Sequence, residues 1–224
     1  YDFNTNTVVM IQCVGSRDDE RPYCSRVCCS TAIKNALKIK EIKPDARVFI
    51  LYRDIRTYGF KEAYYRKARE KGIIFIRYEK ERKPLVTSNG GAIKVKVWDP
   101  ILGVDLVIPA DILALSAATV PRPMSKEVAQ LLKVSLTQDG FFLEAHMKLR
   151  PVDFATDGIF LCGLAHSPKT VDESISQACG AAGRSATILS KEYIELEAAI
   201  SKVVDENCDG CAYCVDPCPY KAIT

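Results

Sequence analysis

Four cysteines lie close together near the start of the chain, in the stretch CVGSRDDERPYCSRVCC. They are Cys13, Cys24, Cys28 and Cys29. The first residues, YDFNTNTVV, lack the basic and apolar regions of a secretory signal. Clustered cysteines in such a chain bind metal or carry out redox chemistry more often than they form disulfides. In a helix beginning near Ser25, Cys24 and Cys28 share one face, and Cys29 lies about 100° from Cys28. The sequence therefore predicts one shared inorganic centre.

The predicted centre is an iron–sulfur cluster. A cluster held by four thiolates is net negative, and the free N–H groups and positive dipole end of a helix N-terminus favour an anion. Arg17, Arg21 and Arg26 add nearby positive charge. Zinc also accepts four thiolates, but structural zinc sites usually use two C-x2–4-C pairs instead of adjacent cysteines. Zinc, buried thiols and redox-active thiols are the alternatives that the residues leave open.

A second group of four cysteines follows a more specific pattern. The stretch CDGCAYCVDPCP places Cys208, Cys211, Cys214 and Cys218 in the order C-x2-C-x2-C-x3-C-P, which is the run of bacterial ferredoxins. In those proteins the first three thiolates hold one [4Fe–4S] cluster and the fourth serves a neighbouring cluster. A matching second run does not follow before Thr224. We therefore expect the sequence to be cut within a ferredoxin domain or split across two genes.

The elements that must position the first cysteines alternate between strand and helix. Apolar runs predict buried strands, and apolar residues at helical spacing predict helices. This alternation is typical of a parallel sheet, so we expect a Rossmann-like α/β fold. The junction that carries Cys13 lacks the glycines of a dinucleotide-binding loop, so nucleotide binding is not expected there. The predicted strands are 7–14, 46–54 and 73–79, and the predicted helices are 25–40, with Ser25 as N-cap, and 60–72.

The rest of the chain is predicted to be less regular. Asn89, Gly90 and Gly91 indicate a hairpin turn, and antiparallel strands are expected on the alternating segments that follow. The two prolines of VPRPMSKEVAQLLKV predict a linker and then a short helix. Further predicted elements are a buried strand at 111–119, a strand at 157–165 and one or two helices over 167–203, with Pro168 in the first turn. We expect a Rossmann-like domain over 1–120, a second part over 121–203 and a partial ferredoxin-like segment over 204–224.

Composition and charge limit the functions open to the chain. Its 224 residues are 48% apolar and 26% charged, with a net charge of +3. That charge is too small, and the basic residues too interspersed with acids, to indicate nucleic-acid binding. No apolar run reaches the roughly 20 residues that a membrane span needs. We expect a cytoplasmic protein without a membrane span.

Residues 155–189, ATDGIFLCGLAHSPKTVDESISQACGAAGRSATIL, resemble the second FAD-binding motif of thioredoxin-reductase-like flavoproteins. In that motif a strand ending in Gly-Asp leads into a helix whose N-terminus points at the isoalloxazine ring. The helix dipole there favours negative charge on the reduced flavin. Leu164 stands here where the motif has Asp, directly after Gly163. A plain closing strand and packing helix is the alternative interpretation.

Together with the two cysteine groups, this motif resembles the HdrA subunit of heterodisulfide reductase over nearly the whole chain. Members of that family carry FAD on a thioredoxin-reductase-like core, an added [4Fe–4S] site and ferredoxin clusters, and their FAD performs electron bifurcation. The resemblance implies an electron-transfer subunit of an anaerobe. It makes the first four cysteines ligands of the added cluster and Cys208, Cys211 and Cys214 ligands of a ferredoxin cluster, with Cys218 serving its neighbour. It also places four residues against the flavin: Gly163, Lys169, Gln177 and Ala178.

The resemblance also implies partners. These are the other heterodisulfide reductase subunits and hydrogenase or ferredoxin-type electron donors, with a homodimer as a further expectation. The family's N-terminal G-x-G-x-x-G flavin domain does not occur in residues 1–224. The chain is therefore expected to carry only half of an FAD site, and not to act as an enzyme alone.

Two other functions are compatible with these residues. One is a metal-stabilised docking scaffold without redox chemistry of its own. The other is a relative of the pyridine-nucleotide disulfide reductases, which would need a C-x-x-C redox pair outside the ferredoxin run. For His166 we favour a surface loop over a flavin or proton role, and for Cys179 a packing role. Cys162, beside Gly163, is a candidate redox thiol without a partner.

Overall fold

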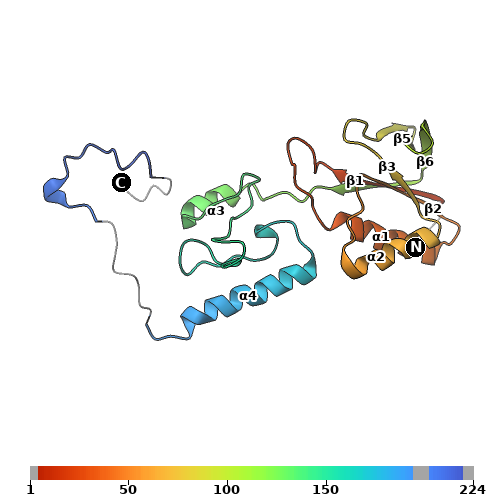
Figure 1. Ribbon diagram of the computed structural model, residues 1–224. Coiled ribbons are helices and arrows are strands. Elements are labelled where there is room, and N and C mark those ends of the chain that lie inside the picture. Colours follow the sequence, from red (N-terminus) through yellow and green to blue (C-terminus); the bar gives the residue numbers. More distant parts are fainter. Residues whose placement is uncertain (1–4, 194–201, 219–224) are drawn as a thin grey trace. The chain divides into compact units, whose positions relative to one another are not determined.

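The computed structural model describes residues 5–193 and 202–218 and contains two compact units (Figure 1). The first unit comprises Tyr1–Val120 with Pro168–Thr170, and the second comprises Pro121–Ser167 with Val171–Thr224. The two units differ in construction, and each is described by itself. No helix in the described part of the chain is long and apolar enough to span a bilayer.

A four-stranded parallel sheet with two crossover helices forms the centre of the first unit. Its elements are β1 (Thr7–Val14), α1 (Cys28–Ile42), β2 (Arg47–Tyr52), the 3-10 turn η1 (Gly59–Lys61), α2 (Glu62–Glu70), β3 (Ile74–Arg77) and β7 (Ile112–Ala117). The strand order is β3-β2-β1-β7, and all of the pairs are parallel. The Rossmann-like α/β arrangement expected from the alternation of strand and helix is confirmed.

A second sheet of the same unit is antiparallel. It contains β4 (Leu85–Asn89), β5 (Ala92–Asp99) and β6 (Val104–Ala110), paired in that order. Gly90 and Gly91 form the loop between β4 and β5, with φ values of 57° and 88°. A two-residue loop with positive φ at both positions suits a type I′ turn, whose twist matches that of the strands. The predicted hairpin is confirmed.

Both faces of β1 are buried, and each is buried by a different layer. Val8 and Met10 belong to a core that includes Ile33 of α1 and Ala68 of α2. Val9 belongs to a second core, shared with residues of β5 and β6. Because alternate residues of a strand point to opposite faces, the helices cover one face of the parallel sheet and the antiparallel sheet covers the other. This is why β1 is a continuous apolar run in the sequence.

Two details of the predicted first unit are wrong. Helix α1 begins at Cys28 with Val27 at its N-cap position and has no side-chain cap. Ser25 is instead buried, and its hydroxyl oxygen accepts a hydrogen bond from the backbone N–H of Thr119 at 2.9 Å. The segment 111–119 forms β7 as expected, but this strand lies at the edge of the sheet, and Leu115 stays 55% exposed.

In the described part of the second unit there are two helices, α3 (Ser125–Leu132) and α4 (Val171–Leu189), and two short 3-10 turns, η2 (Gly163–Ala165) and η3 (Asp205–Asn207). The predicted strand at 157–165 is wrong. Asp153 and Phe160 form an isolated bridge there, and the turn η2 follows. The apolar residues of this segment, such as Leu161, instead fill a small core with Phe154 and Ala129. That core gives the segment its apolar pattern without a neighbouring strand.

Of the one or two helices predicted over 167–203, the described residues contain one, which covers only part of that range. Helix α4 begins at Val171, so Pro168 precedes it and does not occupy its first turn, and it ends at Leu189. Residues 194–201 of the prediction lie outside the described residues. The small side chains of α4 allow close packing, because a Cβ atom added at Gly180 would meet the side chain of Val152 at 3.7 Å.

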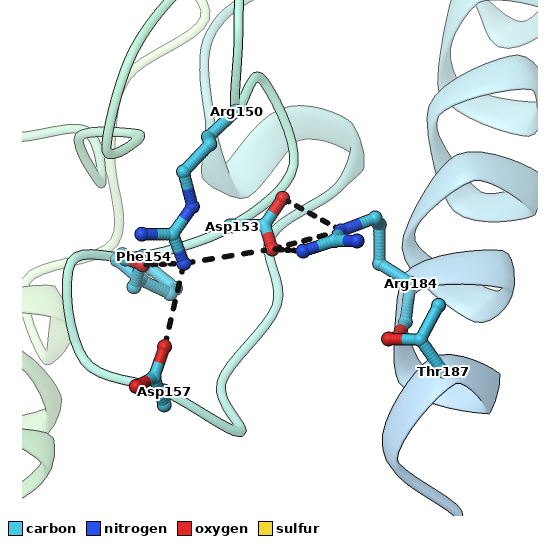
Figure 2. Close-up of polar contacts among 6 residues, drawn as sticks. All are labelled: Arg150, Asp153, Phe154, Asp157, Arg184 and Thr187. Atoms are coloured by element: carbon cyan, nitrogen blue, oxygen red, sulfur yellow. Dashed lines mark hydrogen bonds and ion pairs between the residues drawn. The ribbon is translucent and has the colours of Figure 1, made fainter. Parts of the chain in front are cut away.

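A buried carboxylate joins α4 to the irregular part of the second unit (Figure 2). Asp153 is 3% exposed, and its two oxygens accept hydrogen bonds from Nε of Arg184 at 3.0 and 3.3 Å. Nη2 of Arg184 lies 3.0 Å from the same carboxylate, and Nη2 of Arg150 lies 3.7 Å from it. A carboxylate this far from water needs such partners, so the two arginines fix the loop against α4.

We expect Asp153→Ala to lower the free energy of unfolding by about 2 kcal/mol, because it removes the acceptor of a charge-assisted pair in a buried setting. The loss is measured by urea denaturation followed through the helical circular dichroism signal. The matched control is Asp157→Ala. Asp157 contacts Arg150 at 3.5 Å but its side chain is 82% exposed, so its removal should change the free energy by less than about 0.5 kcal/mol. Equal effects of the two substitutions would contradict the assignment.

Candidate metal centre

Cys13 occupies an unusual backbone position at the end of β1. Its φ is 60°, in the left-handed region, and the register between β1 and β7 shifts between Ile11 and Val14. Such an irregularity turns the side chain away from the alternation of a regular strand. A left-handed non-glycine residue is strained by roughly 1–2 kcal/mol. Such strain is concentrated at functional sites in proteins, and here it aims a thiol at the loop that follows.

The other three cysteines of the first group lie at the start of α1. Cys28 and Cys29 are its first two residues, and Cys24 lies in the preceding loop. The backbone N–H of Arg26 donates a hydrogen bond to Sγ of Cys24 at 3.2 Å. Cys29 is 6% exposed, and its Sγ donates to the carbonyl oxygen of Asp54 at 3.5 Å. The sequence therefore places this group correctly at a strand–loop–helix junction.

The loop between β1 and α1 is tied to the end of β7. The hydroxyl of Tyr23 donates to the carbonyl oxygen of Thr119 at 3.0 Å, and Ser25 accepts from the backbone N–H of the same residue. Nη1 of Arg26 donates to the carbonyl oxygen of Pro168 at 3.4 Å, which links the loop to the short segment 168–170 of the same unit. Three separate contacts thus hold the cysteine loop in place.

Burial and mutual repulsion raise the pKa of three of the thiols. For Cys13, Cys28 and Cys29 the largest cause is burial. The charge of neighbouring thiolates adds to it: Cys24 raises the pKa of Cys13, and Cys13 and Cys24 raise those of Cys28 and Cys29. The four thiols therefore share one electrostatic neighbourhood. Without a bound cation, thiols with raised pKa values are protonated at neutral pH, so binding of a metal must displace protons.

Arg17 supplies the observation that bears most directly on the fit of an anionic cofactor. Its Nη2 forms an ion pair with Asp54 at 2.5 Å, and its charge lowers the pKa of Cys13 against the effect of burial. Among the residues that the structure describes, its Nη1 is one of two buried side-chain nitrogen or oxygen atoms without a hydrogen-bond partner. Buried donors are rarely left without an acceptor. The Arg17 side chain already forms a hydrogen bond that lowers the pKa of the Cys13 thiol. A further thiolate or sulfide acceptor would satisfy Nη1, so the residues fit an iron–sulfur cluster.

The four thiols do not converge on one ion. Within residues 5–193 and 202–218, no group of three or more histidine, cysteine, aspartate or glutamate side chains is arranged so that it could hold a metal ion. Zinc needs its thiolates about 2.3 Å from a common centre. In a four-iron cluster each thiolate binds a different iron atom, so the thiolates stand further apart. Zinc and a four-iron cluster therefore require different spacings of the same four thiolates. Measurement of the bound metal distinguishes the two cofactors.

The second cysteine group lies on a turn-rich loop of the second unit. Cys208, Cys211 and Cys214 are exposed, and Cys218 is half-buried. Gly210 and Ala212 have φ values of 71° and 60°, and the carboxylate of Asp209 accepts a hydrogen bond from the N–H of Cys211 at 3.1 Å. The two left-handed residues bend the chain between the closely spaced cysteines.

The residues predicted to contact a flavin divide between the two units. Lys169 is almost fully buried and belongs to the first unit, whereas Gly163, Gln177 and the exposed Ala178 belong to the second. In the second unit, the N–H of Gly163 donates to Oε1 of Gln177 at 2.9 Å. The structure therefore joins Gly163 to Gln177 directly.

Sequence reasoning missed a hydrogen-bonded series that continues from Gln177. Its Nε2 lies 2.8 Å from Nδ1 of His166, and Nε2 of His166 lies 2.8 Å from Oε2 of Glu144. His166 lies in a turn and is half-buried and paired, so it is more enclosed than the surface loop that we favoured for it. Glu144 carried no signal in the sequence, because it lies 22 residues from His166 in an irregular segment.

Comparison with solved structures defines the class of fold. The chain superposes on thioredoxin reductase of T. acidophilum with a TM-score of 0.54 and 17% identity, covering 83% of this chain and 53% of that one. For thioredoxin reductase of Lactococcus lactis the TM-score is 0.50 at 16% identity, with 82% and 51% covered. The expected thioredoxin-reductase-like fold is confirmed.

Comparison with curated proteins identifies the relatives. The chain is 41% identical over 227 residues to an HdrA iron–sulfur subunit of CoB–CoM heterodisulfide reductase from Methanopyrus kandleri, covering 96% of this chain and 33% of that protein. It is 43% identical over 229 residues to the corresponding iron–sulfur subunit of Methanocaldococcus jannaschii, covering 97% and 34%. The HdrA subunit of the H2:CoB–CoM heterodisulfide, ferredoxin reductase of Methanothermobacter thermautotrophicus is 40% identical over 222 residues, covering 97% and 33%.

The resemblance to the HdrA subunit of heterodisulfide reductase is therefore confirmed over nearly the whole chain. The chain spans about one third of the length of these curated relatives. No protein-family model matches it.

The hydrogen bonds around Gln177 predict the tautomer of His166. Because Oε1 of Gln177 accepts from Gly163, its NH2 group faces Nδ1 of His166, which must then accept, leaving Nε2–H to donate to Glu144. We expect long-range 1H–15N correlation spectra to show a proton on Nε2 of His166 and none on Nδ1. Gln177→Glu should replace the donor by an acceptor and put a proton on Nδ1.

The second histidine of the chain is the internal control for this measurement. Nδ1 of His146 accepts from the N–H groups of Lys148 and Leu149, both at 3.2 Å, and does not contact Gln177. Its signals should not change in the Gln177→Glu protein. An Nδ1–H signal from His166 in the unsubstituted protein would contradict the hydrogen-bond assignment.

Proposed function

We propose that the chain is an electron-transfer segment of a heterodisulfide-reductase-type complex that holds a [4Fe–4S] cluster on Cys13, Cys24, Cys28 and Cys29. One observation carries the proposal. A strained cysteine at a sheet irregularity shares its surroundings with three other thiols and with a buried arginine nitrogen, Nη1 of Arg17, that has no acceptor among the described residues. The names of the relatives, which include the words iron–sulfur subunit, support the same cofactor.

The chain's own residues perform three tasks in this proposal. The four cysteines would ligate the cluster, and the start of α1 and Arg17 would offset its negative charge. Burial of the site would exclude water and so influence the reduction potential of the cluster. The pinning of the loop to Thr119 would keep the ligands in place during electron transfer. A bound cluster supplies one-electron transfer, and FAD supplies the exchange between two-electron and one-electron chemistry.

Further parts of the proposal concern the other predicted sites. Cys208, Cys211 and Cys214 would hold a ferredoxin-type cluster, with Cys218 serving a neighbouring one. Gly163, Lys169, Gln177 and Ala178 would form half of an FAD site, completed by a flavin domain outside residues 1–224. We also propose that this FAD performs electron bifurcation and that the protein lies in the cytoplasm of an anaerobe. Its proposed partners are a second copy of itself, the other heterodisulfide reductase subunits, and hydrogenase or ferredoxin-type electron donors.

We expect protein prepared without oxygen to contain about four iron and four sulfide per occupied cluster, and Cys28→Ser to remove most of the iron bound at the first site. Iron, sulfide, zinc and flavin content are measured together with the visible spectrum before and after dithionite. Cys179→Ser is the matched control, because Cys179 is an exposed residue of α4 outside both cysteine groups. Unchanged iron in the Cys28→Ser protein, or one zinc per chain without colour, would contradict the proposal.

A further inference from the structure

A groove of about 540 Å³ runs between α1 and α2 in the first unit. One wall follows a single face of α1, at positions 30, 33, 34, 37, 38 and 41, which lie at helical spacing. The other wall comes from η1 and α2 and includes Tyr64. Ile33 and Leu37 give the groove an apolar floor. The proposed cofactor sites do not use this surface.

Positive charges outnumber negative ones along the groove. Lys34, Lys38, Lys61 and Lys67 stand along it, and Glu41 is the one carboxylate among its lining residues. The hydrogen bond from Lys38 and the charges of Lys38, Lys67 and Lys71 hold the pKa of the Glu41 carboxyl below its usual value. Lys38 is thus paired with Glu41, at 3.0 Å. Within the described residues, the other three lysines of the groove form no ion pair, so the groove keeps a positive field.

Exposed aromatic side chains extend the apolar surface beyond the groove. Phe60 is 99% exposed, Tyr58 is 67% exposed and Tyr64 is 59% exposed. Phe60 lies between Thr57 and Lys61, which both line the groove. A single exposed apolar side chain is ordinary, but exposed aromatic side chains that are neighbours beside an apolar groove are typical of an interaction surface. Tyrosine and phenylalanine anchor many protein interfaces.

The groove begins beside the candidate metal centre. Ser30, which lines it, directly follows Cys29 in α1. Thr57, on the other wall, directly follows Arg56, whose backbone N–H lowers the pKa of the Cys29 thiol through a hydrogen bond. A molecule seated in the groove would therefore lie close to the cysteines that we propose as cluster ligands.

We infer that this groove, with Tyr58, Phe60 and Tyr64 at its rim, is the docking surface for a small acidic electron-carrier protein. The inference rests on the proposed function, because such a carrier has a reason to dock here only if the cysteines hold a redox centre. Lysines are depleted in permanent interfaces, but they steer transient partners of opposite charge. Electron-transfer encounters are small and weak. The aromatic rim makes the footprint larger than a small anion requires.

Charge reversal within the groove tests the inference. The probe is an acidic two-cluster bacterial ferredoxin, and its binding to the oxygen-free protein is measured by calorimetry at several salt concentrations. We expect Lys34→Glu, Lys61→Glu and Lys67→Glu, combined, to weaken binding by at least about tenfold and to flatten its salt dependence. The neutral set Lys34→Gln, Lys61→Gln and Lys67→Gln should weaken binding less, and it keeps the test open if the reversed protein folds poorly by circular dichroism.

A matched triple elsewhere controls for net charge. Lys83, Lys94 and Lys126 are exposed and lie outside the groove. Their combined change to glutamate alters the total charge equally, and it should weaken binding less than about threefold. Equal weakening by the groove triple and this triple would overturn the inference, as would absence of ferredoxin binding at low salt. Self-association of the chain that only the groove triple abolishes, or displacement of ferredoxin by submillimolar inorganic phosphate, would assign the groove to another occupant and also overturn it.

A second measurement separates this inference from the proposed function. The three groove lysines lie outside the cysteine group, so the groove triple should bind ferredoxin weakly while keeping the iron content of the unsubstituted protein. Electron transfer from reduced ferredoxin should then be slower to the groove triple than to the unsubstituted protein, although both contain the same amount of iron. If the protein holds no iron but binding still depends on the groove lysines, the proposed function fails and the docking surface stands.

Discussion

The central position of β1 is the constraint on which the first unit depends. It pairs with β2 on one side and β7 on the other, and its two faces are buried by helices and by the antiparallel sheet. A strand held on all four sides has one register, because a slip by one residue would exchange its two faces. The end of such a strand is therefore a fixed point. Cys13 stands at that point, and the loop that follows begins from it.

In the second unit, polar contacts hold the segments in place. Its described residues contain no sheet, only isolated bridges and a small apolar core. Asp153 and Gln177 replace the missing ladders: one joins an irregular loop to α4 through arginine, and the other joins η2 to α4 through the backbone of Gly163. Such contacts are directional, so each ties one position of α4 to one position of the loops. They are also more easily lost than apolar packing when a single partner is changed.

The sequence predicted the features that depend on local patterns and missed those that depend on contacts between distant residues. The strand at 7–14 and the turn at Gly90 and Gly91 are local patterns, an apolar run and a pair of residues that tolerate positive φ, and both were predicted. The role of Ser25 was not, because its partner Thr119 is distant in the chain and α1 begins at Cys28 without a side-chain cap. The apolar segment 157–165 looks like a strand because a small core and a buried strand require the same residues.

The candidate site shows the same division. Spacing within the stretch 13–29 was enough to bring four cysteines to one junction, since a strand, a loop and a helix start are neighbours in sequence. The left-handed backbone of Cys13, the ion pair between Arg17 and Asp54 and the link from His166 to Glu144 are tertiary features. They depend on segments that come into contact only after folding, so no local sequence pattern predicts them.

Residue 13 combines a left-handed backbone, which favours glycine, with a thiol side chain, which glycine lacks. Glycine would adopt that conformation freely, but it has no sulfur, whereas every other residue would share the strain and lack the thiol as well. At this position, relief of the backbone strain and retention of the thiol therefore exclude each other.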